Sequence, residues 1–247
     1  MIVGFVGSGS MAAAMARGWG DDVEGMLFTD LGSGRARELA RELGGEAPAS
    51  NAELAQRADL IVLAVKPAKL DEVAGEIGSA EKPLISLLGA TPLEKVAAAF
   101  PQASVCRVMP NVAVEVRRGV LCVAGEVSDE LGALLALLGH VVELPDAEFD
   151  AATAVMGCAP AYLALAVEAL ADAGATAGLD EQLARDLVVE TTGGTAELLR
   201  RRHPADIRRA VASPGGSTEA GLEALDREGA RAAFEAAVRA SLERMRG

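Results

Sequence analysis

The first 145 residues alternate between short apolar runs and amphipathic stretches. Segment 60–65 is apolar on both faces, which is typical of a central parallel strand. Alanine-rich and charged stretches at 11–19 and 35–43 have helical spacing. Strands that alternate with helices predict βαβ units and an open, mostly parallel sheet. We expect strands at 2–6, 26–28, 60–65, 84–88, 105–109, 119–123 and 141–144.

After residue 145 the pattern is helical throughout. Segments 150–155, 161–173, 181–202 and 219–245 have helical spacing and are rich in Ala, Leu, Glu and Arg, with no strand candidate among them. We therefore place a domain boundary near Pro145 and predict an α/β domain over 1–145 and an all-α domain over 146–247. The helical half carries more apolar surface than one small bundle needs, which predicts a homodimer or a higher homo-oligomer.

Composition narrows the classes of partner. The 247 residues are 51 % hydrophobic but 3 % aromatic, so the core must be built from Ala, Val and Leu. Lys and Arg number 23 against 36 Asp and Glu, a formal net charge of −13, which argues against nucleic-acid and anionic-membrane partners. The three cysteines, Cys106, Cys122 and Cys158, lie in apolar runs and predict neither a disulfide framework nor a metal site.

The N-terminus gives no sign of targeting. Met1 and the residues after it include no basic leader, and glycines interrupt the first apolar run. No apolar run is expected to reach the ~20 residues of a membrane helix. We therefore expect a soluble cytoplasmic protein.

A glycine-rich turn joins the first expected strand to the first expected helix. Gly7, Gly9 and Ala12 occupy the three small positions of the dinucleotide-binding fingerprint. The first permits the tight turn, the second lets the backbone approach the pyrophosphate, and the third keeps helix and strand close. The position after an N-terminal strand makes the motif specific and predicts a Rossmann-type doubly wound domain. The cofactor residues of this segment are Gly7, Ser8, Gly9, Ser10 and Met11.

Two features near the second strand point to different dinucleotides. Asp30 has the spacing of the carboxylate that binds the adenosine ribose, which favours NADH. Ser33 and Arg35 follow in the loop and are suited to a 2′-phosphate, which favours NADPH. We expect NAD(P)H as cofactor, with a slight preference for NADH from Asp30. Asp30→Gly should improve the use of NADPH if Asp30 binds the ribose.

The stretch VASPGGSTEAGLEAL, residues 211–225, interrupts the helical half. Two interpretations are open: an interhelical turn with a helix cap, or an anion site formed by backbone N–H groups at a helix start. By itself the stretch favours the turn.

Five segments taken together give the chain a likeness to a known family. AVKP (64–67) and RVMPN (107–111) end two expected strands, where open α/β sheets bind ligands. GCAPAY (157–162), HPADIRRAVASPGGSTEAGL (203–222) and the fingerprint complete the set, in the same order and spacing. The whole chain resembles pyrroline-5-carboxylate reductase. The resemblance implies a nucleotide-binding domain, a helical dimerisation domain, and reduction of a cyclic imine by NAD(P)H in an active site completed across the dimer.

The resemblance also implies roles for individual residues. Thr218 would be catalytic, forming a hydrogen bond with the ring nitrogen of the imine, and no metal is expected. The cofactor would also contact Asn51, Ala64, Val65, Lys66, Pro67 and Asn111. The substrate carboxylate would be received by Ser213, Gly215, Gly216, Ser217 and Thr218. Neither His140 nor His203 has the surroundings of a general base.

Departures from the family pattern leave alternatives open. Cys158 and Ala159 stand where the family usually has serine and glycine, and Ser10 stands where it commonly has asparagine. Proline synthesis from 1-pyrroline-5-carboxylate is the leading function. The alternatives are reduction of another cyclic imino acid and dinucleotide binding without catalysis.

Overall fold

The computed structural model describes residues 1–79 and 81–246 and divides into two compact units. The first, here called the sheet unit, contains Met1–Cys158 and the end of the chain from Leu242. The second, the helical unit, is Ala159–Ser241. The boundary predicted near Pro145 stays a prediction. The last strand ends at Glu143, whereas the first compact unit continues to Cys158.

The sheet unit is built on a seven-stranded sheet in the order β2-β1-β3-β4-β5-β6-β7. Strands β1 to β5 are parallel, β6 is antiparallel to β5, and β7 is parallel to β6. The predicted doubly wound, mostly parallel sheet is confirmed. The strands are β1 (Ile2–Val6), β2 (Gly25–Thr29), β3 (Leu60–Leu63), β4 (Leu84–Ser86), β5 (Val105–Pro110), β6 (Gly119–Gly125) and β7 (Gly139–Glu143).

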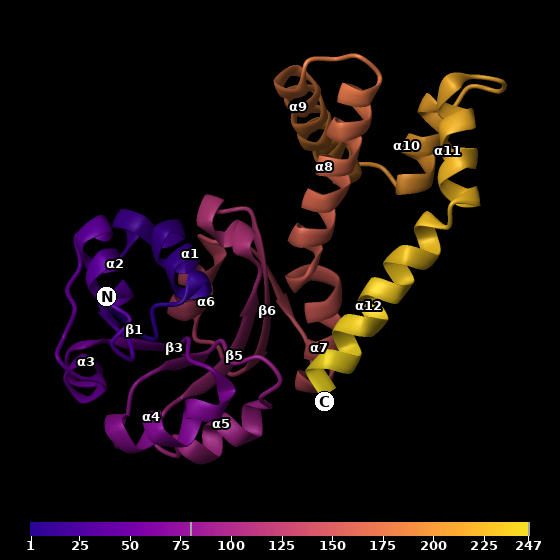
Figure 1. The fold of residues 1–247 in the computed structure, drawn as a ribbon. Helices are drawn as coiled ribbons and strands as arrows, with labels where there is room; N and C mark the ends of the chain where they lie inside the picture. The colour runs from indigo at the N-terminus through magenta and orange to yellow at the C-terminus, as the bar shows by residue number, and fades with distance from the viewer. Residues whose placement is uncertain (80, 247) are drawn as a thin grey trace. The chain divides into compact units, whose positions relative to one another are not determined.

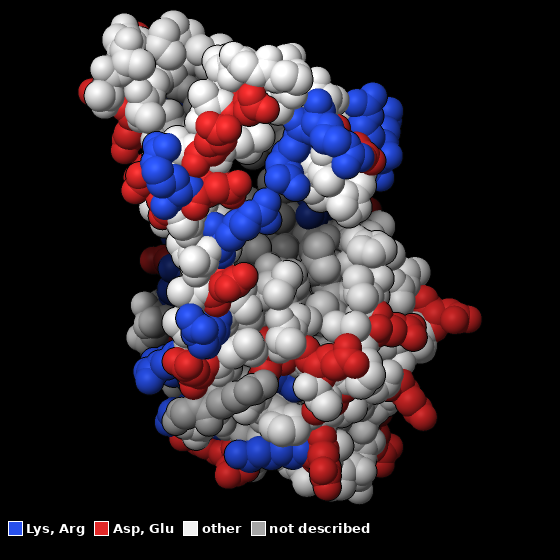
Figure 2. All heavy atoms as spheres, turned by 90° about the vertical axis from the view of Figure 1, so that its right-hand side faces the viewer, with Lys and Arg blue, Asp and Glu red and all other residues white. Residues whose placement is uncertain are grey.

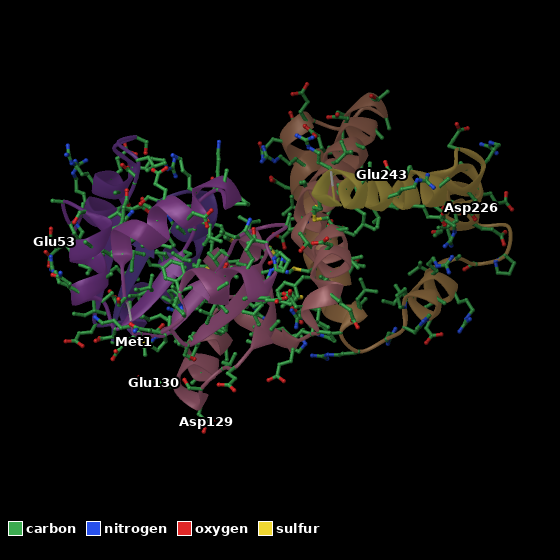
Figure 3. The ribbon with its side chains drawn as sticks, turned by 90° about the horizontal axis from the view of Figure 1, so that it is seen from below. Met1, Glu53, Asp129, Glu130, Asp226 and Glu243 are labelled. Atoms are coloured by element: carbon green, nitrogen blue, oxygen red, sulfur yellow. The ribbon has the colours of Figure 1, made fainter. Side chains whose placement is uncertain are left out.

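Helices cover both faces of this sheet (Figure 1). On β3, Leu60 and Val62 join one hydrophobic cluster while Ile61 and Leu63 join the other, so the strand is buried on both sides. The first cluster includes residues of α1 (Ser10–Trp19), α2 (Arg35–Leu43) and α6 (Asp129–Ala136). The second includes residues of α3 (Asn51–Arg57), α4 (Leu70–Ile77) and α5 (Leu93–Ala99). Side chains at the helix starts, such as Glu53, Asp129 and Glu130, point outward (Figure 3).

The helices on the second face of the sheet begin in different ways. Helix α5 is capped by Pro92, and the Thr91 hydroxyl donates to the Gly89 carbonyl. Helix α4 was not predicted, although Leu70, Val73, Ala74 and Ile77 have the i, i+3, i+4, i+7 spacing of an amphipathic helix. Ser50 caps α3, since its hydroxyl accepts the Glu53 N–H at 3.1 Å.

An ion pair with a buried arginine and a partly exposed aspartate fixes the segment that follows the sheet. This segment contains α7 (Phe149–Ala152) and a π-helical turn, Thr153–Gly157. Arg107, on β5 and 3 % exposed, donates from Nη1 to Asp146 Oδ1 at 2.8 Å. Asp146 Oδ2 accepts the Leu93 N–H, and the Arg107 guanidinium lies 4.5 Å from the centroid of the Phe149 ring. One strand, one helix start and the segment after the sheet are thereby held together.

The helical unit has no strand among its described residues. It contains α8 (Ala159–Thr176), α9 (Glu181–Leu199), α10 (Pro204–Val211), α11 (Ser217–Arg227) and most of α12 (Ala230–Arg246). The single helix predicted over 219–245 is wrong, because Gly229 takes a φ of +78° and ends α11. His203 caps α10, its Nδ1 accepting the Ala205 N–H. Charged side chains of both signs are spread over the face drawn in Figure 2, with uncharged surface between them.

Helix α8 exposes an apolar surface. None of its residues is buried, and Leu163, Leu165 and Leu170 are each more than half exposed. By length and composition only, the helical run 146–176 could cross a membrane: an 18-residue window within it has a mean hydropathy of 1.7 and is 6 % buried. The expectation that no apolar run would reach the length of a membrane helix is wrong, because this helix is apolar on average although scattered polar residues interrupt it.

Candidate cofactor and substrate sites

The glycine turn between β1 and α1 has the geometry that the fingerprint requires. Gly7 has a φ of +98°, and a Cβ built on it would lie 2.6 Å from the Ala64 carbonyl oxygen at the end of β3. Any side chain here would strain the backbone and press on the neighbouring strand. The Gly7 N–H and the buried Ser8 hydroxyl both donate to the Thr29 carbonyl, which ties the turn to the end of β2.

The start of α1 is open to an anion. Gly9 is its N-cap residue and no side chain caps the helix. A Cβ on Gly9 would meet no described heavy atom within 4 Å, so free space lies where the fingerprint expects the pyrophosphate. Backbone N–H groups and the helix dipole favour a phosphate at such a position. Ser10 and Met11 follow in the first turn, Ser10 exposed and Met11 half-buried.

A pocket of about 750 Å³ adjoins the carboxyl end of β2. Its lining comes from the β2–α2 loop, from the segment that leads into α3, and from Glu76 of α4. A Rossmann-type domain binds the adenosine half of its cofactor at this place. The open glycine turn and this pocket therefore both fit a dinucleotide, and NAD(P)H when bound would supply a hydride.

Asp30 lines the pocket but already has partners. Its Oδ1 accepts the Gly32 N–H at 2.7 Å, and its Oδ2 accepts the Ala36 N–H at 2.8 Å and the Ser33 hydroxyl at 2.9 Å. Burial raises the pKa of Asp30, but these hydrogen bonds outweigh that effect and hold the pKa below its ordinary value. The carboxylate thus orders the loop before α2 and keeps its negative charge in the pocket.

The two residues that favoured a 2′-phosphate also make contacts within the chain. The Ser33 hydroxyl donates to Asp30, and Arg35 Nε donates to the Ser8 carbonyl at 3.1 Å. Arg35 therefore lies against the glycine turn and is absent from the described lining of the pocket. Asn51 does line it: its Oδ1 accepts the Thr29 hydroxyl, and its Nδ2 donates to Glu76 Oε2 at 2.5 Å. Glu76 was missed from the sequence because it enters the pocket from the unpredicted helix α4.

The ends of β3 and β5 hold the other predicted cofactor residues. Ala64, Val65, Lys66 and Pro67 follow β3 directly, with Lys66 exposed. Asn111 follows β5 and is 9 % exposed. Its Oδ1 accepts the Val120 N–H and its Nδ2 donates to the Met156 carbonyl, so it fixes the π-helical turn. The family role for Asn111, facing a nicotinamide, stays a prediction.

A turn leads into α11, and no side chain caps the N-terminus of this helix. Ser213 accepts the Gly216 N–H at its carbonyl, and Gly215 has a φ of +71°. The Gly215 N–H donates to Glu219 Oε2 at 2.7 Å. Two of the N–H groups assigned to the substrate carboxylate thus have partners within the chain.

The remaining donors belong to the first turn of α11. Gly216 is the N-cap residue, with a φ of −87°, and no side chain caps the helix. Ser217 and Thr218 begin the helix and are both exposed. Their N–H groups and hydroxyls are therefore the donors available to an anion.

The other reactive side chains have structural surroundings. Burial raises the pKa of Cys106 to about 12 and also raises that of Cys122, so neither forms a thiolate readily. His140 is exposed on β7. Among residues 1–79 and 81–246 no group of His, Cys, Asp and Glu side chains is arranged to hold a metal ion.

Family models match both parts of the chain. A model described as pyrroline-5-carboxylate reductase dimerisation matches residues 146–247. A model described as NADP oxidoreductase, coenzyme F420-dependent, matches residues 2–89. The dimerisation match covers the helices with exposed apolar surface and shows that this region serves homo-oligomerisation.

Relatives match over nearly the full length. The chain is 38 % identical to a pyrroline-5-carboxylate reductase of Thermus thermophilus, covering 99 % of this chain and 97 % of the relative. It is 37 % identical to that of Synechocystis, covering 98 % and 96 %. The structure of 1-pyrroline-5-carboxylate reductase from Streptococcus pyogenes superposes with a TM-score of 0.90 at 29 % identity, covering 99 % and 98 %. The chain belongs to the pyrroline-5-carboxylate reductase family.

Proposed function

We propose that this protein reduces 1-pyrroline-5-carboxylate to L-proline with a hydride from NAD(P)H, the last step of proline synthesis. We expect it to act in the cytoplasm as a homodimer or higher homo-oligomer. The observation that carries the proposal is the start of α11, where exposed Ser217 and Thr218 open a helix that no side chain caps. A substrate carboxylate is the kind of anion that such a helix start binds.

The residues of the chain act by binding and orientation. The N–H groups of Ser217 and Thr218 hold the carboxylate, and the Thr218 hydroxyl holds the imine nitrogen. The glycine turn and the residues after β3 hold the dinucleotide. A protonated cyclic imine already accepts a hydride well. The main requirement is therefore to hold C4 of the nicotinamide against the imine carbon, and such positioning can lower the reaction barrier by ~7–11 kcal/mol. A general base is not needed at the imine.

Cofactor preference follows from the charges around the pocket. Asp30 keeps its charge there, while Ser33 and Arg35 have other partners. These contacts support the preference for NADH over NADPH, because a carboxylate repels a 2′-phosphate. The Asp30 carboxylate already accepts hydrogen bonds from Gly32, Ser33 and Ala36, which reduces its capacity to accept from a ribose hydroxyl. The preference therefore rests on the charge of Asp30 more than on its capacity to accept hydrogen bonds.

Thr218→Ala tests the site at the start of α11. One hydrogen bond contributes ~0.5–1.5 kcal/mol, or up to ~3 kcal/mol with a charged partner. We therefore expect kcat/KM to fall about tenfold to a hundredfold, with dinucleotide affinity and melting temperature unchanged. Thr218→Ser keeps a hydroxyl and should recover most of the activity. A lower melting temperature with unchanged kinetics per folded molecule would show that the stretch is a turn and not an anion site.

The identity of the imine is a second question, raised by Cys158 and Ala159. Cys158 is half-buried and directly follows the π-helical turn. A thiol in place of the family's hydroxyl favours, as the second candidate, reduction of a related cyclic imino acid. Comparing kcat/KM for five-membered and six-membered cyclic imino acids decides between them. Well-folded protein that reduces none of them would contradict both.

Oligomerisation can be tested at the apolar surface of the helical unit. Leu165 is 64 % exposed on α8, and a charge there would oppose burial against a second copy. Light scattering at micromolar concentration should give at least a dimer for the wild type and a smaller species for Leu165→Glu. The control is Val116→Glu, 68 % exposed in the sheet unit, which should leave the mass unchanged. A stable, active wild-type monomer would contradict the prediction.

A further inference from the structure

Glu76 brings a second carboxylate to the pocket at the end of β2. It stands on α4, near the helix end, and lines the pocket together with Asp30. The other charged residue of the described lining is Arg37, so the lining has two acidic groups against one basic group. An exposed glutamate on a helix surface is common, but Glu76 accepts a hydrogen bond from Asn51, which lines the pocket.

The position of Glu76 is set by a chain of hydrogen bonds. The Thr29 hydroxyl donates to Asn51 Oδ1, and Asn51 Nδ2 donates to Glu76 Oε2 at 2.5 Å. Thr29 is 6 % exposed at the end of β2 and its hydroxyl also lies 3.4 Å from the Phe5 carbonyl oxygen, which anchors the chain to the sheet. Because Asn51 uses both atoms of its amide in this chain, its orientation is fixed and Glu76 is held at the pocket.

We propose that Glu76 is a specificity-determining residue, whose carboxylate, together with that of Asp30, excludes adenosine nucleotides that carry a 2′-phosphate. The inference rests on the proposed dinucleotide site and not on which imine is reduced. The dinucleotide-binding fingerprint includes an acidic residue at the end of the second strand, here Asp30. Glu76 lies on α4 and is not part of that fingerprint. Two carboxylates in one pocket oppose the two negative charges of a 2′-phosphate, while a ribose with free hydroxyls meets acceptors.

Glu76→Gln is the informative substitution. The glutamine Oε1 can still accept the Asn51 N–H, so the shape of the wall is kept and only the charge is removed. Asp30→Asn is less clean, because its carboxylate accepts three hydrogen bonds that order the loop before α2. The matched control is Glu72→Gln, one turn earlier on α4, where the carboxylate accepts from Lys69 Nζ and does not line the pocket.

The experiment is calorimetric titration of the full chain with 5′-ADP and with 2′,5′-ADP, which differ by the 2′-phosphate alone. We expect the wild type to bind 5′-ADP more tightly. Glu76→Gln should tighten 2′,5′-ADP about tenfold, the effect of one charge near a protein surface, and change 5′-ADP less than about threefold. The gain should shrink as salt is raised, because ions screen exposed charges. Glu72→Gln should change neither affinity.

Other outcomes separate the possible failures. Equal changes for both nucleotides in Glu76→Gln overturn the proposal, because Glu76 would then act through the wall and not on the phosphate. A wild type that prefers 2′,5′-ADP also overturns it. If no variant binds either nucleotide, the dinucleotide site itself is wrong and the inference falls with it. If the nucleotides bind as expected but no imine is reduced, the proposed reaction fails and the inference stands.

Discussion

Gly7→Ala is expected to abolish dinucleotide binding and to lower the melting temperature as well. The residue has a φ of +98°, where an L-residue is strained, and its Cβ would lie 2.6 Å from the Ala64 carbonyl oxygen. Such a backbone conformation alone costs about 1–3 kcal/mol in a residue with a side chain. Relief of the contact requires β1 and β3 to shift where the cofactor residues after β3 lie. Thermal unfolding and titration with NAD⁺ and NADP⁺ measure the two effects.

Gly9→Ala tests whether the free space at Gly9 is needed for ligand binding and not for folding. The Cβ would meet no described atom within 4 Å, and Gly9 has an ordinary φ of −73°. We expect an unchanged melting temperature with about hundredfold weaker dinucleotide binding, since two charge-assisted hydrogen bonds would be displaced. Gly75→Ala, in the middle of α4 and also free of contacts, is the control that should alter neither affinity nor fold. Undiminished affinity in Gly9→Ala would mean that the pyrophosphate does not bind here.

Asp146→Ala should have the largest effect on stability among changes outside the glycine turn. It leaves the guanidinium of Arg107, 3 % exposed, without its carboxylate, and loss of one partner of a buried pair costs about 3–5 kcal/mol. For a chain of this size each kcal/mol corresponds to a fall of about 2–4 °C in melting temperature. We therefore expect a fall of about 6–20 °C, measured by thermal unfolding.

A double substitution shows whether the charge is the cause. Arg107→Met with Asp146→Ala removes both charges and should be less harmful than Asp146→Ala alone, because no buried charge is left uncompensated. Glu72→Ala, which breaks an exposed ion pair with Lys69, is the control and should cost less than about 1 kcal/mol. If Asp146→Ala were no more harmful than Glu72→Ala, the buried pair would not hold the segment to the sheet.

Local chemistry explains why much of the sheet unit could be predicted. The fingerprint depends on glycines whose conformations any Rossmann-type turn needs, and β3 alternates between two cores, so both are visible in a short window. The antiparallel direction of β6 could not be predicted, because an apolar run has no polarity. Glu76 meets Asn51 across 25 residues, and such contacts depend on how α3 and α4 pack.

In the helical unit, too, contacts that depend on the folded backbone could not be predicted from the sequence. The anion site at 213–218 was predicted with N–H donors from Gly215 and Gly216, and both donate within the chain. One helical turn brings the carboxylate of Glu219 back to the Gly215 N–H, a contact that was not predicted. Gly229 breaks the last predicted helix because a lone glycine can either continue a helix or end it, and the local pattern is the same in both cases.

If a second copy covers the exposed leucines of α8, the stability of this protein depends on protomer concentration. Surface that a second copy covers contributes to folding only when that copy is present, so unfolding free energy must rise with protomer concentration. Dilution would then act like a mild denaturant, and activity per chain would decline in dilute samples before any residue of the sites had changed. Residues that look like tolerant surface in one chain, such as Leu163 and Leu170, would accept polar substitutions as poorly as a core does.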